Sequence, residues 1–244
     1  HHDGQWVGAK NKDLCLSWSK IEKFDQCPRL FNATYIEKRF PFDNSNPILE
    51  WGKKVQKGLE DYVLKGIALP IELRKFQPAA DAIKGKAAKL EAAGKLRTPL
   101  NGEQDWAMTA NGRYTTWFDS ANVFMRNKAD VLWGGQRVLF SADYKTGKGK
   151  YPKLEQLEVV ALTGKAQPKL AHYQEHKSAL IFLEADKVIP LTVDLTPPEH
   201  EKLMRKYLSK GIEIVEAFEE QEWAMNPSVL CAWCDDTTCP YNKK

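Results

Sequence analysis

Apolar residues between positions 13 and 95 recur three and four residues apart, which is the spacing of one buried face of an α-helix. The first predicted helix opens at Ser19, because Ser19 and Glu22 have the spacing of a capping box. A short second helix is expected to begin at Pro28, since proline favours the first turn of a helix. Two longer predicted helices follow, over residues 48–63 and 79–96.

From residue 103 to 146 the chain is instead rich in β-branched and aromatic residues, which favour strands. Gly134 and Gly135 within this block are typical of a hairpin turn. The later predicted elements are a helix over 154–162, strands over 178–183 and 188–195, and a long helix that opens at Pro197. The whole pattern predicts an α/β fold with a helical N-terminal part, a mixed but mainly antiparallel central sheet flanked by helices, and a cysteine-rich C-terminal tail.

Composition is that of an ordinary globular protein, because 43% of the 244 residues are hydrophobic and 28% are charged. The length suits one domain, which we place at residues 13–244. We interpret residues 1–12, which begin His1-His2, as a tag remnant or a disordered leader. The net charge of +4 is too small to indicate nucleic-acid binding by itself, since a mixed-charge surface explains it equally well.

The absence of long apolar runs and of a secretory leader bears on where the protein acts. No run approaches the roughly 18 residues that a membrane span needs, so no membrane partner is expected. Five cysteines are too few for a disulfide scaffold of this size, and four of them are placed for another purpose. We therefore expect an intracellular, cytoplasmic protein, in the host cytoplasm if it is viral.

The tripeptide Asp143-Tyr144-Lys145 is the first candidate for chemistry. On a strand, residues two apart point to the same face, so the Asp143 and Lys145 side chains would project together. A carboxylate can hold Mg²⁺ or Mn²⁺, and a neighbouring ammonium can orient water and offset charge on a phosphate. The alternative interpretation is an exposed ion pair on a strand, which the triplet alone does not exclude.

Asp130 lies one predicted strand earlier and could share a metal ion with Asp143. The sequence allows two registers for the intervening hairpin. A turn centred on residues 134–135 would pair Asp130 with Leu139. A four-residue loop that begins at the first glycine would pair Asp130 with Ser141, which leaves Asp143 as a diagonal neighbour at about 7–8 Å.

Three further polar residues are candidates for the same site. Gln56 and Glu60 lie four residues apart on one predicted helix face, beside an apolar stripe. Glu103 opens the strand block and supplies another acid. A solvated helix flank and an exposed strand end are the alternative interpretations of these positions.

The tail segment that contains Cys231, Cys234 and Cys239 is a compact thiol cluster. Three thiolates at this spacing can converge on one metal centre, and Cys27 is the natural fourth ligand. Such a centre would join the N-terminal helices to the C-terminal tail, and both zinc and an iron-sulfur cluster suit soft thiolate ligands. The alternative is a set of reduced cysteines without a metal, and Cys15 stands apart as a small buried apolar residue.

The order and spacing of these segments resemble the RecB-like branch of the PD-(D/E)XK nucleases from Leu16 onward. The segments that carry the resemblance are Leu16-Ser17-Trp18-Ser19-Lys20-Ile21, Cys27-Pro28-Arg29-Leu30-Phe31, residues 52–62, Asp130, Asp143-Tyr144-Lys145-Thr146-Gly147 and Gln156. The cysteines are similar to those of CRISPR-associated and helicase-associated exonucleases that hold a 4Fe-4S cluster, and the layout is similar to that of tailed-phage exonucleases. Two residues depart from the family pattern: Gln56 replaces a histidine, and Val160 replaces a tyrosine.

The resemblance implies a restriction-endonuclease-like core and metal-dependent hydrolysis of DNA, with exonuclease action on single-stranded or end-frayed DNA. The implied metal ligands, for Mg²⁺ or Mn²⁺, are Asp130, Asp143, Gln56, Glu60 and Glu103. The implied catalytic residues are Lys145, Asp143, Asp130 and Gln156. The implied DNA-binding residues, on a basic loop, are Lys148, Lys150, Tyr151 and Lys153.

The resemblance also implies partners and a structural cofactor. A 4Fe-4S cluster on Cys27, Cys231, Cys234 and Cys239 is expected, with Zn²⁺ as the alternative. A helicase or a single-strand-binding protein is a candidate partner in recombination, repair or phage DNA processing. The rival functions are a non-catalytic DNA-binding subunit that keeps the fold, and a structural zinc protein in which the Asp-x-Lys triplet is incidental.

Overall fold

The computed structural model describes residues 12–40 and 46–242, so the expected leader lies outside the described residues except for Lys12, which opens a short helical turn, η2 (Lys12–Leu14). The first long helix, α1, spans Trp18–Gln26. Its N-cap is Ser17, whose side chain accepts a hydrogen bond from the Lys20 backbone N–H. The predicted capping box at Ser19 was therefore wrong, because Ser17 has the extended backbone that an N-cap needs and the helix begins directly after it.

The other predicted N-terminal helices are confirmed, with shifts at their ends. Pro28 begins α2 as expected, and Gly66 ends α3 in the left-handed conformation that glycine favours. α4 ends earlier than predicted, because a turn with Gly94 at φ 65° leads into the first strand. The bounds are α2 Pro28–Phe31, η3 Asn32–Ile36, α3 Pro47–Lys65, η4 Ile71–Phe76 and α4 Gln77–Ala92.

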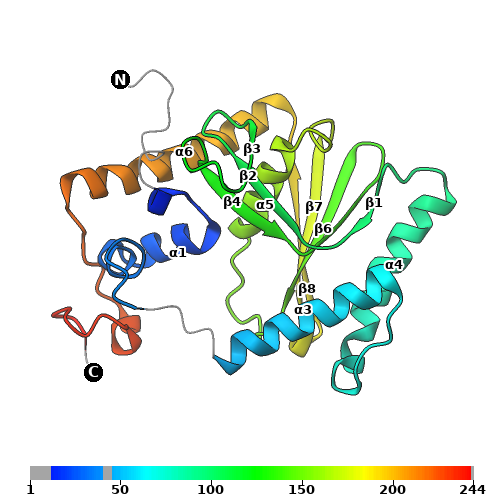
Figure 1. The fold of residues 1–244 in the computed structure, drawn as a ribbon, viewed down its shortest axis with the longest axis horizontal. Helices are drawn as coiled ribbons and strands as arrows, with labels where there is room; N and C mark the ends of the chain where they lie inside the picture. The colour runs from blue at the N-terminus through cyan, green and yellow to red at the C-terminus, as the bar shows by residue number, and fades with distance from the viewer. Residues whose placement is uncertain (1–11, 41–45, 243–244) are drawn as a thin grey trace.

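A five-stranded sheet in the order β1-β5-β6-β7-β8 forms the centre of the fold (Figure 1). Among the described strand pairs of this sheet, only β6–β7 is parallel, so the predicted mixed, mainly antiparallel sheet is confirmed. The parallel pair arises because α5 forms the crossover between the two strands. The bounds are β1 Thr98–Asn101, β5 Val131–Gly134, β6 Val138–Lys145, α5 Glu155–Ala166, β7 Glu175–Phe182, η5 Leu183–Ala185 and β8 Lys187–Asp194.

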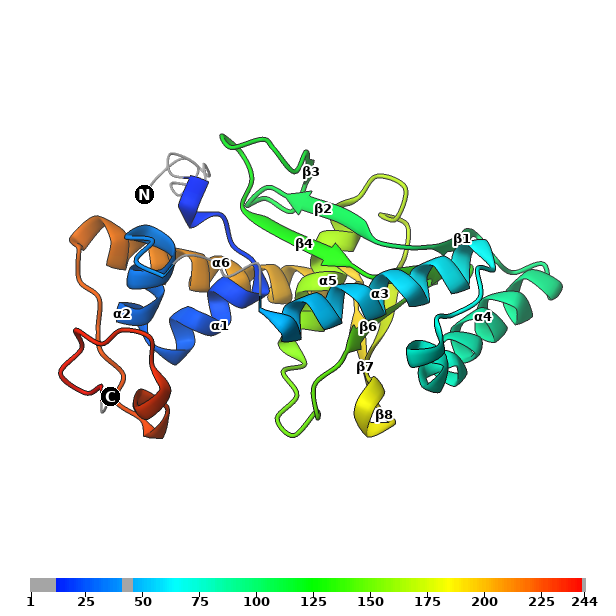
Figure 2. The ribbon, with the colours of Figure 1, turned by 60° about the horizontal axis from the view of Figure 1, so that its bottom comes forward.

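Helices cover both faces of this sheet because its strands alternate their side chains. Val131 and Trp133 of β5 pack in the cluster formed by α3 and α4, whereas Leu132 packs with Val160 of α5 on the other face. Figure 2 shows α3 running along the sheet, with α4 beside it. α6 (Pro197–Glu220) packs with α5 and extends toward the N-terminal helices.

A second sheet of three strands, ordered β3-β2-β4, lies beside the first one. Its strands are β2 (Gln104–Met108), β3 (Tyr114–Thr115) and β4 (Met125–Ala129). β4 ends one residue before Asp130, and β5 begins one residue after it. Asp130 therefore occupies the point where the chain passes from the small sheet into the central one.

The β5–β6 hairpin has neither of the two predicted registers. Leu132 pairs with Ser141 and Gly134 with Leu139, while the Gly135 N–H donates to the Val138 carbonyl oxygen at 2.9 Å. The turn is thus centred on residues 136–137 rather than on the glycines. The turn lies further along the chain than predicted because Gly134 is the last residue of β5, and sequence alone does not distinguish a glycine at a strand end from one in a turn.

Candidate functional site

The end of β6 brings together two acids and a lysine. Asp143 and Lys145 project from the same strand, and their Oδ2 and Nζ atoms lie 2.7 Å apart. Continuing the observed register by one residue places Asp130 opposite Asp143, not diagonal to it as predicted. The Tyr144 backbone N–H donates to Asp130 Oδ2 at 3.0 Å, which holds that carboxylate against the β6 backbone.

Gln56 of α3 completes this group from outside the sheet. Its Nε2 donates to Asp130 Oδ1 and to Glu103 Oε2, each at 2.9 Å. The helix therefore delivers an amide to the position between two carboxylates that belong to different parts of the chain. An amide here can both link the carboxylates and present its own oxygen as a weak metal ligand.

The electrostatics of Asp130 favour a cation at this position. Burial raises the pKa of Asp130 from its ordinary 3.8 to about 7, and repulsion by the Asp143 and Glu103 carboxylates adds to the effect. The Tyr144 N–H and the Lys145 charge act in the opposite direction but do not compensate. A divalent ion between the carboxylates would remove both causes, since it replaces lost hydration and offsets the repulsion.

Glu60 and Glu103 lie behind this group and do not line the cleft described below. Glu103 accepts from Gln56, and its Oε1 lies 2.7 Å from the Lys128 Nζ. Glu60 Oε1 accepts from the Glu103 backbone N–H at 3.3 Å, and Glu60 Oε2 lies 3.5 Å from the Lys57 Nζ. Both acids are thus tied to protein groups, with Glu103 adjacent to the candidate site and Glu60 one step further away.

A cleft of about 570 Å³ opens directly onto these residues. Gln56, Asp130, Asp143, Lys145 and Gln156 all line it, so the fold brings these five predicted residues to one surface. The side chain of Gln156 is anchored from its own loop, because its Nε2 donates to the Lys153 carbonyl oxygen at 2.9 Å.

Sequence reasoning missed four side chains of the cleft wall: Lys20, Trp117, Arg126 and Lys128. Arg126 and Lys128 are two residues apart on β4, so their side chains point to the same face of the strand. Two basic residues at this spacing, shortly before Asp130, were the sequence signal that could have indicated a basic wall beside the acidic site. Without the register of the small sheet, it was not distinguishable from a solvated strand.

The predicted DNA-binding loop lies outside the cleft. Lys148, Lys150, Tyr151 and Lys153 are exposed, and none of them lines the cavity. Tyr151 is 78% exposed, and the Lys150 Nζ lies 5.4 Å from the centre of its ring. An exposed aromatic ring beside a cation suits a nucleic acid that runs along the surface outside the cleft.

The donor set suits a hard divalent cation. Asp143 Oδ2 is buried and accepts no hydrogen bond from the described residues, although Lys145 balances its charge. Two carboxylates and an amide oxygen are ligands of the kind that Mg²⁺ and Mn²⁺ prefer. Within residues 12–40 and 46–242, however, no three side chains of His, Cys, Asp or Glu converge as a ready metal site. A metal ion held here would take two carboxylates from the protein, and Gln56, water or substrate would complete its coordination.

The four candidate cysteine ligands surround one small cavity between the N-terminal helices and the C-terminal tail. Cys27 precedes α2, while Cys231, Cys234 and Cys239 come from η6 (Val229–Trp233) and the segment after it. All four are free thiols, and the Ser228 N–H donates to the Cys231 sulfur at 3.3 Å. A preformed metal group is not present among the described residues, but the four cysteines do line the same space.

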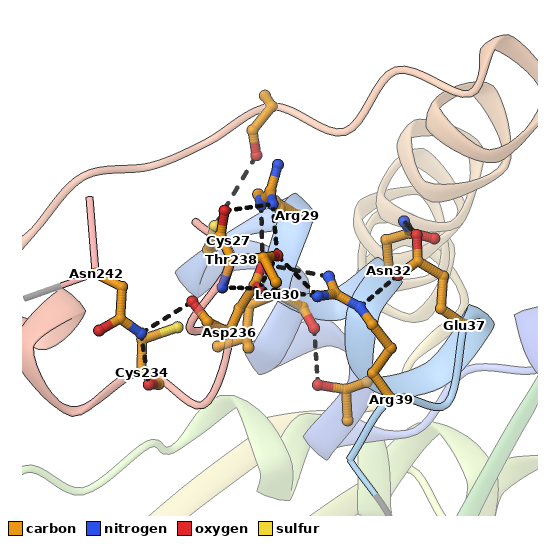
Figure 3. Close-up of polar contacts among 12 residues, drawn as sticks. Cys27, Arg29, Leu30, Asn32, Glu37, Arg39, Cys234, Asp236, Thr238 and Asn242 are labelled. Carbon is orange, nitrogen blue, oxygen red and sulfur yellow. Dashed lines mark hydrogen bonds and ion pairs between the residues drawn. The ribbon is translucent and has the colours of Figure 1, made fainter. Parts of the chain in front are cut away.

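Ion pairs of a buried aspartate attach the C-terminal tail to the N-terminal part of the chain beside this cavity (Figure 3). The carboxylate of Asp236 is 1% exposed and lies 2.8 Å from Arg29 Nε and 2.9 Å from Arg39 Nη1. These hydrogen bonds hold the pKa of Asp236 well below its ordinary value, although burial acts against them. The N- and C-terminal parts of the chain are therefore joined by side chains other than the cysteines. Cys15, in contrast, is 4% exposed and packs in a small apolar cluster, as predicted.

Comparison with known proteins assigns the fold to a family. Residues 15–242 match the family described as the PD-(D/E)XK nuclease superfamily. No curated protein sequence matches the chain. A solved structure described as the crystal structure of SSO0001 is similar at 13% sequence identity and a TM-score of 0.46, with 92% of this chain and 86% of that chain covered. That likeness is too distant to support a conclusion about function.

No described helix is long and apolar enough to cross a membrane. The family match spans nearly the whole chain and includes Asp130, Asp143 and Lys145. This protein therefore belongs to the PD-(D/E)XK nuclease superfamily, a superfamily of metal-dependent nucleases.

Proposed function

We propose that this protein is a Mg²⁺- or Mn²⁺-dependent deoxyribonuclease that degrades single-stranded or end-frayed DNA as an exonuclease. The observation that carries the proposal is the convergence of Asp130, Asp143 and Lys145 in one open cleft. Membership in a nuclease superfamily supports the reaction class, while the preference for ends and for DNA processing is our own inference.

Each residue has a proposed role in hydrolysis. Asp130 and Asp143 hold the metal ion, with Gln56 as a weaker ligand, and the ion supplies a Lewis acid for the scissile phosphate. Lys145, held at 2.7 Å by Asp143, positions the attacking water and offsets the charge that develops on the phosphate oxygens. Gln156, at the cleft wall, orients Lys145 or contacts the nucleotide.

The two outer acids have a supporting role in this proposal. Glu103 fixes the amide of Gln56 through its 2.9 Å contact, and Glu60 fixes Glu103 through its backbone. We therefore assign them the role of orienting groups behind the metal ligands rather than of ligands themselves. The exposed loop residues Lys148, Lys150, Tyr151 and Lys153 would contact DNA beyond the cleft, and a helicase or single-strand-binding protein is the proposed supplier of the strand.

We further propose that Cys27, Cys231, Cys234 and Cys239 hold a 4Fe-4S cluster, with Zn²⁺ as the alternative. The shared cavity and the N–H donated to the Cys231 sulfur support a bound centre, since thiolates gain from such donors. Its role would be structural, because the residues around it join the chain ends. Metal analysis of protein purified without oxygen, with visible absorbance, distinguishes iron from zinc.

A non-catalytic DNA-binding subunit is the second candidate. The specific observation in its favour is Gln56, which stands where related nucleases have a histidine. Its amide group donates hydrogen bonds to two carboxylates, those of Glu103 and Asp130. This candidate predicts DNA binding without metal-dependent cleavage. It also predicts that Gln56→His raises cleavage from a negligible level.

The decisive experiment compares wild-type protein with Asp143→Ala and Lys145→Ala on end-labelled single- and double-stranded DNA. Mg²⁺, Mn²⁺ and EDTA are tested in parallel, and Asp186→Asn serves as a folded control because that residue lies in the turn before β8. Metal-dependent degradation that both site variants lose, and that Asp186→Asn keeps, supports the nuclease. Cleavage that survives in both site variants rules out the proposed site.

A further inference from the structure

The small sheet provides the cleft with an aromatic and basic wall that the hydrolytic roles above do not use. Trp117 follows β3, and Arg126 and Lys128 project from β4 on the same face. Arg126 Cζ lies 5.6 Å and Lys128 Nζ 5.8 Å from the centre of the Trp117 ring. All three residues line the same cleft as Asp130, Asp143 and Lys145.

The charges of this wall are not equivalent, because most of its cations already have partners. Lys128 is paired with Glu103 and Asp105, and the Lys20 Nζ donates to the carbonyl oxygens of Asp13 and Cys15. Lys145 is paired with Asp143. Arg126 has no ion pair with a carboxylate anywhere in residues 12–40 and 46–242.

The side chain of Arg126 also carries an unused donor. Its Nε is buried and makes no hydrogen bond to the described residues. A buried donor without an acceptor is costly, and a guanidinium stays charged at any ordinary pH. An anion with more than one oxygen would suit this side chain, because the guanidinium presents several donors in one plane.

Trp117 limits what that anion belongs to. The ring is partly exposed, lines the cleft and lies beside the two cations. An aromatic ring next to a phosphate-binding arginine accommodates a base only if the base is unpaired, since paired bases present their edges and not their faces. The start of α1 at Ser17 lies on the same cleft and adds the positive end of a helix to the wall.

We propose that Trp117 and Arg126 form a subsite for one nucleotide of single-stranded DNA, in which Arg126 binds the backbone phosphate and Trp117 stacks on the base. The subsite rests on the proposed function, because it would hold the strand next to the phosphate that the acidic site hydrolyses. It would make the cleft selective for a strand that is already separated from its complement.

Fluorescence anisotropy with labelled oligonucleotides in EDTA tests the subsite without cleavage. We expect Trp117→Ala to weaken binding of a single strand roughly 5- to 100-fold and binding of a blunt duplex much less. Arg126→Gln should weaken it roughly tenfold and lower the salt dependence by about 0.7 in the log–log slope, as expected for one lost phosphate contact. Trp117→Phe and Arg126→Lys, which keep a ring and a charge, should retain part of the affinity and show that the wall still folds.

A neutral methylphosphonate placed at one backbone position after another locates the contact. At one position the substitution should weaken binding by the wild-type protein but not by Arg126→Gln. Arg205→Gln is the matched control, because Arg205 is exposed on α6 and pairs with Glu201. Equal binding by wild type, Trp117→Ala and Arg126→Gln overturns the subsite, as does a lack of single-strand binding by the wild type.

The same variants separate this inference from the proposed function. If the wild type binds a single strand through Trp117 and Arg126 but does not cleave it with Mg²⁺ or Mn²⁺, the subsite stands and the nuclease proposal fails. If cleavage is metal-dependent and both variants bind and cleave like wild type, the nuclease stands and the subsite fails.

Discussion

The ionised carboxylate of Asp130 destabilises the folded, metal-free protein, and a neutral side chain of the same shape would not. Its pKa is raised to about 7 in the folded protein, against an ordinary value of 3.8, so the folded state resists its ionisation. The penalty is absent below the ordinary pKa, grows as the pH rises, and is complete above the folded pKa. A shift of this size corresponds to at most about 4 kcal/mol at pH 8 and to less than about 2 kcal/mol at pH 5.

The substitution Asp130→Asn removes this penalty at the cost of one contact. The side-chain oxygen of an asparagine can keep the hydrogen bond from the Tyr144 N–H. Its NH2 group would then face the Gln56 Nε2, and two donors cannot form a hydrogen bond with each other. Loss of that second hydrogen bond costs about 1 kcal/mol. We therefore expect Asp130→Asn to raise the free energy of unfolding by up to about 3 kcal/mol at pH 8 and by almost nothing at pH 5.

Urea unfolding followed by tryptophan fluorescence in EDTA measures this difference. Asp105→Asn is the control, because Asp105 is an exposed carboxylate on the adjacent strand β2. Added Mg²⁺ should stabilise the wild type and not Asp130→Asn, since a ligand that binds only the folded state raises its stability. The reasoning is refuted if Asp130→Asn is no more stable than wild type at pH 8, or if its gain is the same at both pH values.

Three further predictions concern other charged groups. Lys145→Ala should lower metal-dependent cleavage at least about 100-fold with little change in DNA affinity, which rates and anisotropy measure separately. Asp236→Asn should cost about 1.5–3 kcal/mol because it removes the charge that accepts hydrogen bonds from the half-buried Arg29 and Arg39, and limited proteolysis should then cut the tail first. His176 is buried with a pKa lowered by burial to about 3, so stability should fall as the pH drops below 6.5 toward that value. His176→Asn should weaken that acid dependence in urea titrations, and an unchanged pH profile would contradict this assignment.

The sequence alone determined the elements and the chemistry that lies within one element. Helical spacing identified the segment that became α3, and alternation placed Asp143 and Lys145 on one face of β6, where they form an ion pair. Both results depend on residues a few positions apart, for which the backbone period is sufficient. The same local reasoning correctly placed Pro28 at the start of α2 and Cys15 among buried apolar groups.

Helix ends and hairpin registers were less certain because competing local signals have nearly equal energies. Serine is a good N-cap at either position, but Ser17 caps the helix because its backbone is extended, whereas Ser19 lies within the helix. Gly134 and Gly135 favour a turn, but glycine also tolerates a strand, and pairing with β1 and β6 places Gly134 in β5.

Only the tertiary structure decided which residues share the cleft. Gln56 meets Asp130 because α3 packs across the sheet, and Trp117 and Arg126 meet the acids because the small sheet folds against the central one. The tertiary structure also determines that Glu60 lies behind Glu103 and that the basic loop lies outside the cleft. These relationships join residues far apart in the chain, where no backbone period links them, so they depend on how whole elements pack.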